Sequence, residues 1–225
     1  MSRLRVLFVH QNFPGQFKHL APWLAAQGHE VVALGDAANA GVRPERWPFR
    51  LVAYGARGAT RSNAHHYLHS FENAVRRGQD VARACLELRR EGFAPDLVLG
   101  HPAWGEMLFL RDVFPRARLV PYFEYFYRAE GGDVGFDPEF PPTLDTRFKL
   151  RIRNSTQLHA LSECDAGISP TAWQRSTYPA REQSLIRVIH EGIDTARLRP
   201  DAAASFRLAD GRVLTRAEQV VTFVS

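Results

Sequence analysis

Short apolar runs alternate with longer amphipathic stretches along most of the chain. Continuous apolar runs are typical of strands buried on both faces, and they predict strands at 4–10, 30–34, 49–54, 96–100, 118–123, 165–169 and 185–190. Apolar positions at helical spacing predict helices between Phe17 and Gly28 and at 63–91, 106–113, 144–163 and 171–178. This alternation predicts an α/β fold with a Rossmann-like, doubly wound and mostly parallel sheet.

The pattern changes after Asp194. Residues 200–216 are polar and rich in alanine and turn-forming residues, which predicts a linker or a hairpin. Residues 219–225 form an apolar run with no helix after it, as expected of a strand that opens another domain. We therefore predict a Rossmann-like domain at 1–199, followed at 200–225 by a linker and the first strand of a truncated second domain.

The segments that follow the predicted strands carry the residues suited to bind a ligand. In open α/β sheets, ligands bind at the carboxyl ends of the strands. Polar, aromatic and small residues gather at these ends, together with His101 and Glu124, and this mixture is typical of a sugar or polyol site. The candidate substrate-binding residues are Gln11, Asn12, Phe13, Gly15, Trp104, Tyr125, Tyr127, Arg128, Ser169 and Glu191.

Several familiar motifs are absent from the sequence. The patterns G-x-G-x-x-G, G-x-x-x-x-G-K-[ST] and G-x-S-x-G do not occur, which argues against a dinucleotide fingerprint, a P-loop enzyme and an α/β-hydrolase. Cys85 and Cys164 lie far apart and outside any C-x-x-C context, so we expect two reduced residues rather than a disulfide or a zinc site. The N-terminal apolar run is too short for a signal peptide, and no run reaches about 18 residues, so we expect a cytoplasmic protein.

Arginine carries almost all of the positive charge. The formal net charge is +5, and Lys18 and Lys149 are the only lysines. Arginine favours bidentate contacts with phosphate or carboxylate, which fits a phosphorylated substrate, an anionic membrane surface or nucleic acid. The arginines of the helices at 63–91 and 144–163 are more simply solvated faces, and no interleaved aromatic residues support nucleic-acid binding. Peripheral contact with the inner face of the membrane stays open as an alternative.

Three histidines, His65, His66 and His69, lie at the start of the helix predicted at 63–91. Histidines one helical turn apart are sometimes metal ligands. Polar residues are expected at a helix start in any case, and we interpret the three histidines in that simpler way. We therefore predict neither a metal site nor a cofactor.

Three parts of the chain resemble family 4 glycosyltransferases. Residues 10–17 (HQNFPGQF) and 24–31 (LAAQGHEV) resemble the family's opening, in which a glycine loop leads to a helix that ends in a G-H-x-V turn. Residues 186–195 (IRVIHEGIDT) and 198–200 (LRP) resemble the segment that enters the linker between its two domains, although Glu191 stands where many members have asparagine. Residues 220–225 resemble the first strand of the second domain.

This resemblance implies a two-domain GT-B enzyme with a cleft between its Rossmann-like domains. The second domain of such an enzyme binds the nucleotide-sugar donor, and the first shapes the pocket for a carbohydrate or lipid-linked acceptor. The reaction is expected to retain the anomeric configuration and to need no metal. Because the donor-binding domain would be missing, we expect the 225-residue chain alone to be inactive.

The resemblance also assigns roles to three residues. Glu124 occupies a position where many relatives have a histidine, so it is expected near the transferred sugar, where a carboxylate stabilises developing positive charge; the alternative is a surface carboxylate. His101 either orients an acceptor hydroxyl or caps the helix that follows it. Gly15 either lets the backbone approach the donor's phosphates at a helix N-terminus or is a plain turn glycine. Glu124 and His101 are thus the candidate catalytic residues.

Two other functions fit the same predicted fold. A sugar-nucleotide epimerase or hydrolase would share the two-domain plan but would need no acceptor. A non-catalytic module that binds a sugar or a nucleotide would use the same rim of loops without a reaction. Substitutions of Glu124 and His101 separate the catalytic readings from this last one.

Overall fold

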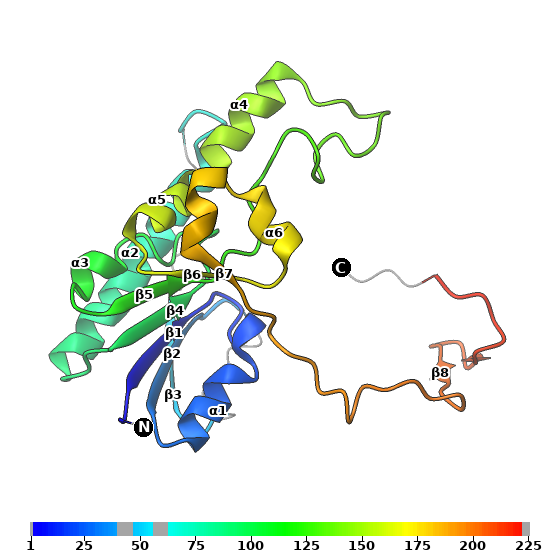
Figure 1. The fold of residues 1–225 in the computed structure, drawn as a ribbon, viewed down its shortest axis with the longest axis horizontal. Coiled ribbons are helices and arrows are strands. Elements are labelled where there is room, and N and C mark those ends of the chain that lie inside the picture. Colours follow the sequence, from blue (N-terminus) through cyan, green and yellow to red (C-terminus); the bar gives the residue numbers. More distant parts are fainter. Residues whose placement is uncertain (1, 40–46, 56–62, 222–225) are drawn as a thin grey trace. The chain divides into compact units, whose positions relative to one another are not determined.

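A five-stranded parallel sheet lies at the centre of the larger of two compact units in the computed structural model, which describes residues 2–39, 47–55 and 63–221 (Figure 1). Its strand order is β3-β2-β1-β4-β5, and every neighbouring pair is parallel. The strands are β1 (Arg5–Val9), β2 (Glu30–Asp36), β3 (Arg50–Tyr54), β4 (Leu97–Gly100) and β5 (Arg118–Pro121). The predicted Rossmann-like α/β fold is therefore confirmed.

Side chains alternate between two apolar layers, one on each face of this sheet. In β1, Leu7 and Val9 belong to the cluster that contains residues of α2 (His69–Arg90) and α3 (Leu110–Val113). Val6 and Phe8 belong to the cluster on the other face, with the 3₁₀ turn η1 (Gly15–Phe17) and α1 (Leu20–Ala26). Burial on both faces explains why β1 is apolar at successive positions. Figure 1 shows α2 and α1 on opposite sides of the sheet.

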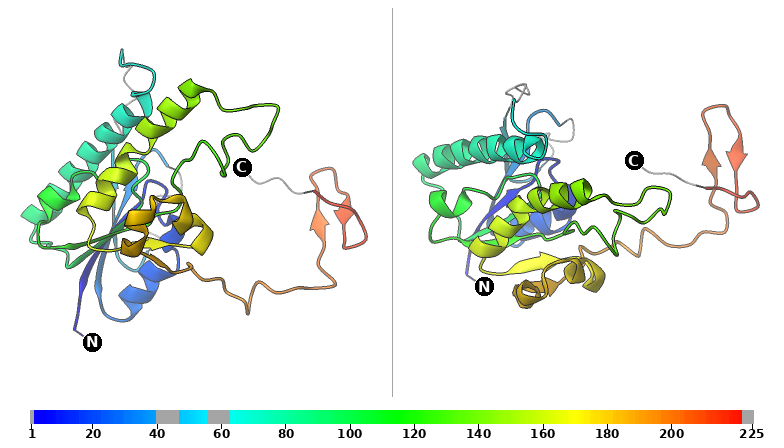
Figure 2. Two further views of the ribbon diagram at one scale, coloured as in Figure 1. Left: turned by 45° about the horizontal axis from the view of Figure 1, so that its top comes forward. Right: turned by 90° about the horizontal axis from the view of Figure 1, so that it is seen from above.

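A second parallel pair, β6 (Gly167–Ser169) and β7 (Ile186–Val188), adjoins the edge of β5. A bridge between Tyr122 and Ile168 and a hydrogen bond from the Asp165 N–H to the Leu119 carbonyl contribute to this connection. A third apolar cluster forms around Phe123 and Tyr178, where residues of α5 (Ser155–Glu163) pack near α6 (Ala172–Thr177) and the 3₁₀ turn η3 (Ala180–Leu185). Figure 2 shows α2 running beside α4 (Leu144–Arg153) and α5, which it contacts.

The helix predicted at 144–163 has the expected ends, but it is interrupted at Asn154, which separates α4 from α5. The Asn154 side chain accepts a hydrogen bond from the Tyr127 backbone N–H at 3.0 Å and donates one to the Tyr127 carbonyl at 2.8 Å. This buried amide ties the helix break to a distant loop. Its two bonds anchor the junction between α4 and α5 to Tyr127.

Two other predicted helices begin later than the apolar spacing suggested. The helix predicted at 63–91 begins at His69, and before it the His65 ring nitrogen accepts a hydrogen bond from the Tyr67 N–H at 3.3 Å. Such local side-chain bonds favour a turn over a helix. The helix predicted at 106–113 is confined to α3, and a turn precedes it because Glu106 points into the interior.

The smaller unit comprises residues 192–225. It contains an antiparallel hairpin of β8 (Phe206–Arg207) and β9 (Val213–Leu214), within the segment predicted as a linker or hairpin. Residues 219–221 are not in a strand, and residues 222–225 of the strand predicted there lie outside the described residues. None of the helices in the described part of the chain combines the length and apolarity that a bilayer crossing requires.

Candidate functional site

The loops after β1, β4 and β5 meet at the carboxyl end of the sheet. The Oε2 atom of Glu124, after β5, lies 3.0 Å from Nε2 of His101, after β4. The same oxygen accepts a hydrogen bond of 3.4 Å from Nε2 of Gln16, in the turn after β1. Residues that are up to 108 positions apart in the sequence therefore converge on one carboxylate.

His101 uses both of its ring nitrogens inside the protein. Its Nδ1 atom accepts a hydrogen bond from the Ala103 N–H at 3.3 Å, so its Nε2 carries the proton that it donates to Glu124. The ring is buried and stacks on Trp104, with 4.2 Å between ring centroids. These contacts place His101 behind Glu124 rather than in contact with an acceptor hydroxyl. The alternative role as a helix cap is also wrong, because α3 begins at Leu110 and its N-cap is Phe109.

Glu124 is held in place yet open to solvent, with a side chain that is 41% exposed. The hydrogen bond from His101 lowers the pKa of this carboxyl below its ordinary value, against the opposing effect of partial burial. The group is therefore a carboxylate at neutral pH. A fixed negative charge at the rim of the sheet suits a position beside positive charge that develops during a reaction.

The ring of His10 lies next to His101. His10 was not among the site residues predicted from the sequence. It is buried, and its ring centroid lies 5.8 Å from that of His101 and 5.6 Å from that of Trp104. Burial lowers the pKa of His10 to about 4, and the neighbouring His101 adds to this shift. The sequence signal for His10 is its place as the first polar residue after the apolar run of β1.

The His10 ring leaves no room for a side chain at Gly15. Its φ of +47° is in the left-handed region, and a Cβ atom there would lie 2.6 Å from the His10 ring. Both facts require glycine, so the structure supplies a packing reason for this residue. Its role toward the donor's phosphates stays a prediction.

Glu106 supports the loop after β1 from inside the fold, and the sequence analysis did not identify it. Its buried carboxyl accepts hydrogen bonds from the Gln11 N–H at 3.0 Å and from the Tyr54 hydroxyl at 3.2 Å. Burial raises the pKa of Glu106 to about 7. The carboxyl therefore fixes Gln11 at the rim rather than facing a ligand itself.

A cavity of about 690 Å³ adjoins the site through Trp104. Its walls come from the start of α2, the loop after β4, and helices α4 and α5. Two of the predicted substrate-binding residues, Trp104 and Tyr127, line it, together with the basic residues Arg77, Lys149 and Arg153. This aromatic and basic cavity, which is connected to Glu124 through Trp104 and His101, has the size and composition of a small-molecule pocket.

The other predicted substrate-binding residues are spread over several surroundings. Phe13 is fully buried between Trp47 and Phe49, so its side chain belongs to the core rather than to a ligand site. Asn12 is exposed, and its N–H donates to His10. Ser169 is buried at the end of β6.

Three predicted residues have partners within the loops beyond β5. The Tyr125 hydroxyl donates a hydrogen bond to Asp133 at 3.0 Å. Arg128 is exposed and donates to the Ser176 carbonyl at 3.4 Å. Glu191 lies closer to the site, because it accepts a hydrogen bond from Tyr122, whose ring centroid is 6.2 Å from that of His101.

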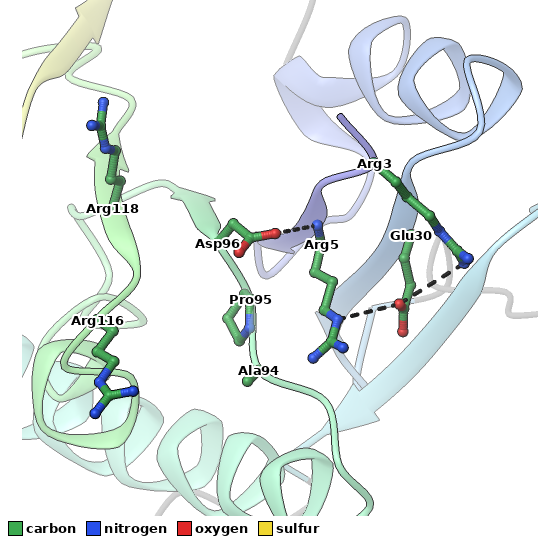
Figure 3. Close-up of a pocket in the computed structure, with 8 residues that line it drawn as sticks. All are labelled: Arg3, Arg5, Glu30, Ala94, Pro95, Asp96, Arg116 and Arg118. Atoms are coloured by element: carbon green, nitrogen blue, oxygen red, sulfur yellow. Dashed lines mark hydrogen bonds and ion pairs between the residues drawn. The ribbon is translucent and has the colours of Figure 1, made fainter. Parts of the chain in front are cut away.

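Another cavity, of about 760 Å³, lies at the opposite end of the strands (Figure 3). Four arginines line it, and Arg3 and Arg5 are engaged by the carboxylate of Glu30 at 3.9 and 3.6 Å. The Arg5 N–H donates to Asp96, as Figure 3 also shows. Because open parallel sheets bind their ligands at the carboxyl ends, this cavity is not the candidate site.

The described residues contain no group of three or more His, Cys, Asp or Glu side chains arranged to hold a metal ion. The rings of His65 and His66 lie 4.4 Å apart, and the His69 Nε2 atom is bonded to the Ala64 carbonyl at 2.8 Å. His65 and His66 lie just before α2 and His69 is its first residue, so the three histidines stand at a polar helix start.

Three solved structures resemble this chain. Os79 from O. sativa, solved with UDP and deoxynivalenol-3-glucoside, is 13% identical, with a TM-score of 0.54 over 87% of this chain and 55% of that one. The catalytic domain of starch synthase IV from Arabidopsis thaliana is 16% identical, with a TM-score of 0.48 over 87% of this chain and 53% of that one. A putative UDP-N-acetylglucosamine 2-epimerase from Listeria monocytogenes is 13% identical, with a TM-score of 0.48 over 83% of this chain and 45% of that one.

The chain spans about half the length of these structures. No curated protein matches it. A family model of the glycosyl transferase family 4 group matches residues 27–198, which is most of the chain and includes β2 to β7. This protein therefore belongs to the glycosyl transferase family 4 group.

Proposed function

We propose that this chain is the acceptor-side half of a glycosyltransferase that moves a sugar from a nucleotide-sugar to an acceptor. In this reaction the bond between the sugar's anomeric carbon and the nucleotide phosphate breaks. A bond forms from that carbon to an acceptor hydroxyl oxygen, and a nucleoside diphosphate and a proton are released. Family membership supports the reaction class, and the UDP bound in the Os79 structure agrees with a nucleoside diphosphate as the carrier.

The observation that carries the proposal is the Glu124 carboxylate, held by His101 and Gln16, while His101 also stacks on Trp104 in the wall of the 690 Å³ cavity. Positive charge develops on the sugar ring as its bond to phosphate breaks. A preorganised carboxylate stabilises that charge without having to reorient during the reaction. Glu124 is thus proposed as the catalytic residue, and His101 as the residue that positions it.

The cavity beside Trp104 is proposed to hold the acceptor. Trp104 stacks on His101, and His101 holds Glu124, so a ligand packed on Trp104 lies two contacts away from the carboxylate. The donor is proposed to bind through a second domain that follows this one. Retention of the anomeric configuration and independence from metal are part of the proposal and rest on the family resemblance.

The decisive experiment measures nucleoside diphosphate release from a panel of nucleotide-sugars by a protein that joins this chain to the domain after it. We expect release that depends on an added acceptor, continues in EDTA, and yields a product with the donor's anomeric configuration by NMR. The 225-residue chain alone is expected to give no turnover. Product formation without an acceptor would instead indicate an epimerase or a hydrolase.

A further inference from the structure

Two basic side chains on one face of α4 point to a particular class of acceptor. Thr146, Lys149, Leu150 and Arg153 all line the 690 Å³ cavity, at the spacing of three and four residues that places side chains on one helix face. The sequence pattern suggested that the basic residues of this helix were a solvated face. The basic residues of α4 are all exposed, as that pattern predicts, but Lys149 and Arg153 also line the cavity, whereas Arg147 pairs with Glu130.

Tyr127 fixes the position of the Arg153 side chain. Its guanidinium carbon lies 3.9 Å above the centroid of the Tyr127 ring, and its Nη2 atom donates to the Tyr127 hydroxyl at 2.9 Å. These contacts fix the position of the guanidinium but leave its charge uncompensated. Among the described residues, no carboxylate lies within ion-pair distance of Arg153 or of Lys149.

Arg77, on the α2 wall, is already partly neutralised. Its Nε atom lies 3.7 Å from the Asp36 carboxylate, and its Nη1 donates to the Trp104 carbonyl at 3.2 Å. It therefore holds the loop that carries Trp104 and adds less charge to the cavity than the two residues on α4. Asp145, at the start of α4, lies 4.0 Å from His66 and accepts a hydrogen bond from Tyr67.

The described lining of the cavity contains no Asp or Glu. Lys149 and Arg153 are like charges one helical turn apart, which is an unfavourable arrangement on an isolated helix. A bound anion would reverse this effect, because it would be attracted by both. Neutral hydroxyl groups would gain much less from two cations, since hydrogen bonds to ionised partners are roughly twice as strong as neutral ones.

We infer that this cavity selects an acceptor that carries a phosphoryl or carboxyl group next to a ring. The anion would lie between Lys149 and Arg153, and the ring would pack against Trp104 and Tyr127. The inference rests on the proposed function for the identity of the ligand as an acceptor. The anion selectivity itself depends only on the residues of the cavity.

Calorimetric titration of this chain with glucose 6-phosphate, glucuronate and glucose tests the inference without a donor. We expect both anionic sugars to bind at least roughly tenfold more tightly than glucose. Inorganic phosphate is expected to bind more weakly than glucose 6-phosphate, because it lacks the ring. Equal affinity for glucose and for the two anions would overturn the inference, and so would binding of inorganic phosphate as tight as that of glucose 6-phosphate.

Three variants locate the binding. Lys149→Met and Arg153→Met should each weaken binding of glucose 6-phosphate by roughly fivefold to tenfold, while leaving the affinity for glucose unchanged. Arg151→Met is the matched control, because Arg151 is an exposed residue of the same helix that does not line this cavity. An equal loss in Arg151→Met would overturn the inference in favour of general charge attraction. If Arg153→Met unfolds, as its circular dichroism would reveal, the exposed Lys149 decides the question alone.

The same variants separate this inference from the proposed reaction. Anion-selective binding without any sugar transfer in the protein with both domains would refute the transferase proposal and leave the cavity's selectivity intact. Transfer to a neutral acceptor that is as efficient as transfer to the matching anionic acceptor would refute the selectivity and leave the reaction intact.

Discussion

The Nε2 atom of His101 lies 3.0 Å from the Oε2 atom of Glu124, although the two residues follow different strands of the sheet. The other ring nitrogen of His101 accepts a backbone N–H, so the proton on Nε2 is committed to Glu124. His101 is therefore not available as a base for an acceptor hydroxyl. The pair instead presents one oriented carboxylate, which supports the electrostatic role proposed for Glu124.

Glu124→Gln should lower kcat for sugar transfer by roughly 100-fold with little change in KM, because it removes the charge and keeps the shape of the side chain. The measurement is steady-state kinetics of the protein with both domains. Glu139→Gln is the matched control, since Glu139 is an exposed carboxylate in the loop before α4. A kcat within twofold of the wild type for Glu124→Gln would refute the catalytic role.

His101→Leu should move the acid limb of the pH profile of kcat/KM to higher pH. The hydrogen bond from His101 lowers the pKa of Glu124, so its loss lets that pKa rise toward the ordinary value, and Glu124 is protonated sooner as the pH falls. His101→Gln keeps a donor and should restore most of the wild-type profile. Superimposable acid limbs for the wild type and His101→Leu would contradict the positioning role.

Gly105→Ala should destabilise the fold by about 3 kcal/mol or more, because the new Cβ meets backbone as well as an unfavourable φ. Gly105 has a φ of +101°, and a Cβ there would lie 2.1 Å from the Ala74 carbonyl oxygen of α2. Gly92→Ala is the control, with a φ of +90° but open space around the added atom. It should cost only about 1 kcal/mol. Urea denaturation gives the free energy of unfolding of both variants. An equal decrease in the two would show that the contact between Gly105 and α2 does not restrict the side chain.

Glu106→Gln should gain stability relative to the wild type as the pH rises from about 4.5 to above 7. The pKa of Glu106 is raised to about 7 in the fold, so in this range the native protein holds a proton that the unfolded chain has released. The contribution of Glu106 to the free energy of unfolding of the wild type therefore falls as the pH rises. Glutamine does not titrate, and its side-chain oxygen still accepts the hydrogen bonds from Gln11 and Tyr54.

The comparison in that experiment must be made at each pH, because His10 acts in the opposite direction. Its pKa is lowered to about 4, so stability through His10 falls as the pH drops below the ordinary histidine value. The two buried groups thus partly cancel in the wild type. A difference between wild type and Glu106→Gln that stays constant from pH 4.5 to 8 would contradict the burial of a titrating carboxyl at this position.

The strands were predictable because burial on both faces leaves a continuous apolar run in the sequence, as in β1. The break at Asn154 was not, since an asparagine in a helical pattern resembles any other exposed polar residue. Its partner, the Tyr127 backbone, is 27 residues away, and nothing local marks the bond between them. The late start of α2 could not be predicted either. It reflects the hydrogen bond from the Tyr67 N–H to His65, and this bond leaves no mark in the pattern of apolar residues.

The meeting of Glu124 and His101 followed from one rule, that parallel strands end at the same edge of a sheet. That rule does not predict which side chains near the edge of the sheet are buried. His10 and Glu106 were passed over because each stands beside apolar residues that account for its segment, and their burial is a property of the packed layers. Phe13 was misassigned for the converse reason, since a residue in a rim loop can still turn its ring into the core.

The two hydrogen bonds between the Asn154 side chain and the Tyr127 backbone fix the rotation of α4 about its own axis. The Asn154 amide holds the Tyr127 backbone at the C-terminal end of this helix, so the azimuth of Lys149 and Arg153 is set by their count of residues back from Asn154. Deleting or inserting one residue between Lys149 and Asn154 would rotate Lys149 by about 100° about the helix axis, away from the cavity. The residues of α4 that do not line the cavity can therefore vary, whereas the number of residues between Lys149 and Asn154 cannot change without turning Lys149 away from the cavity.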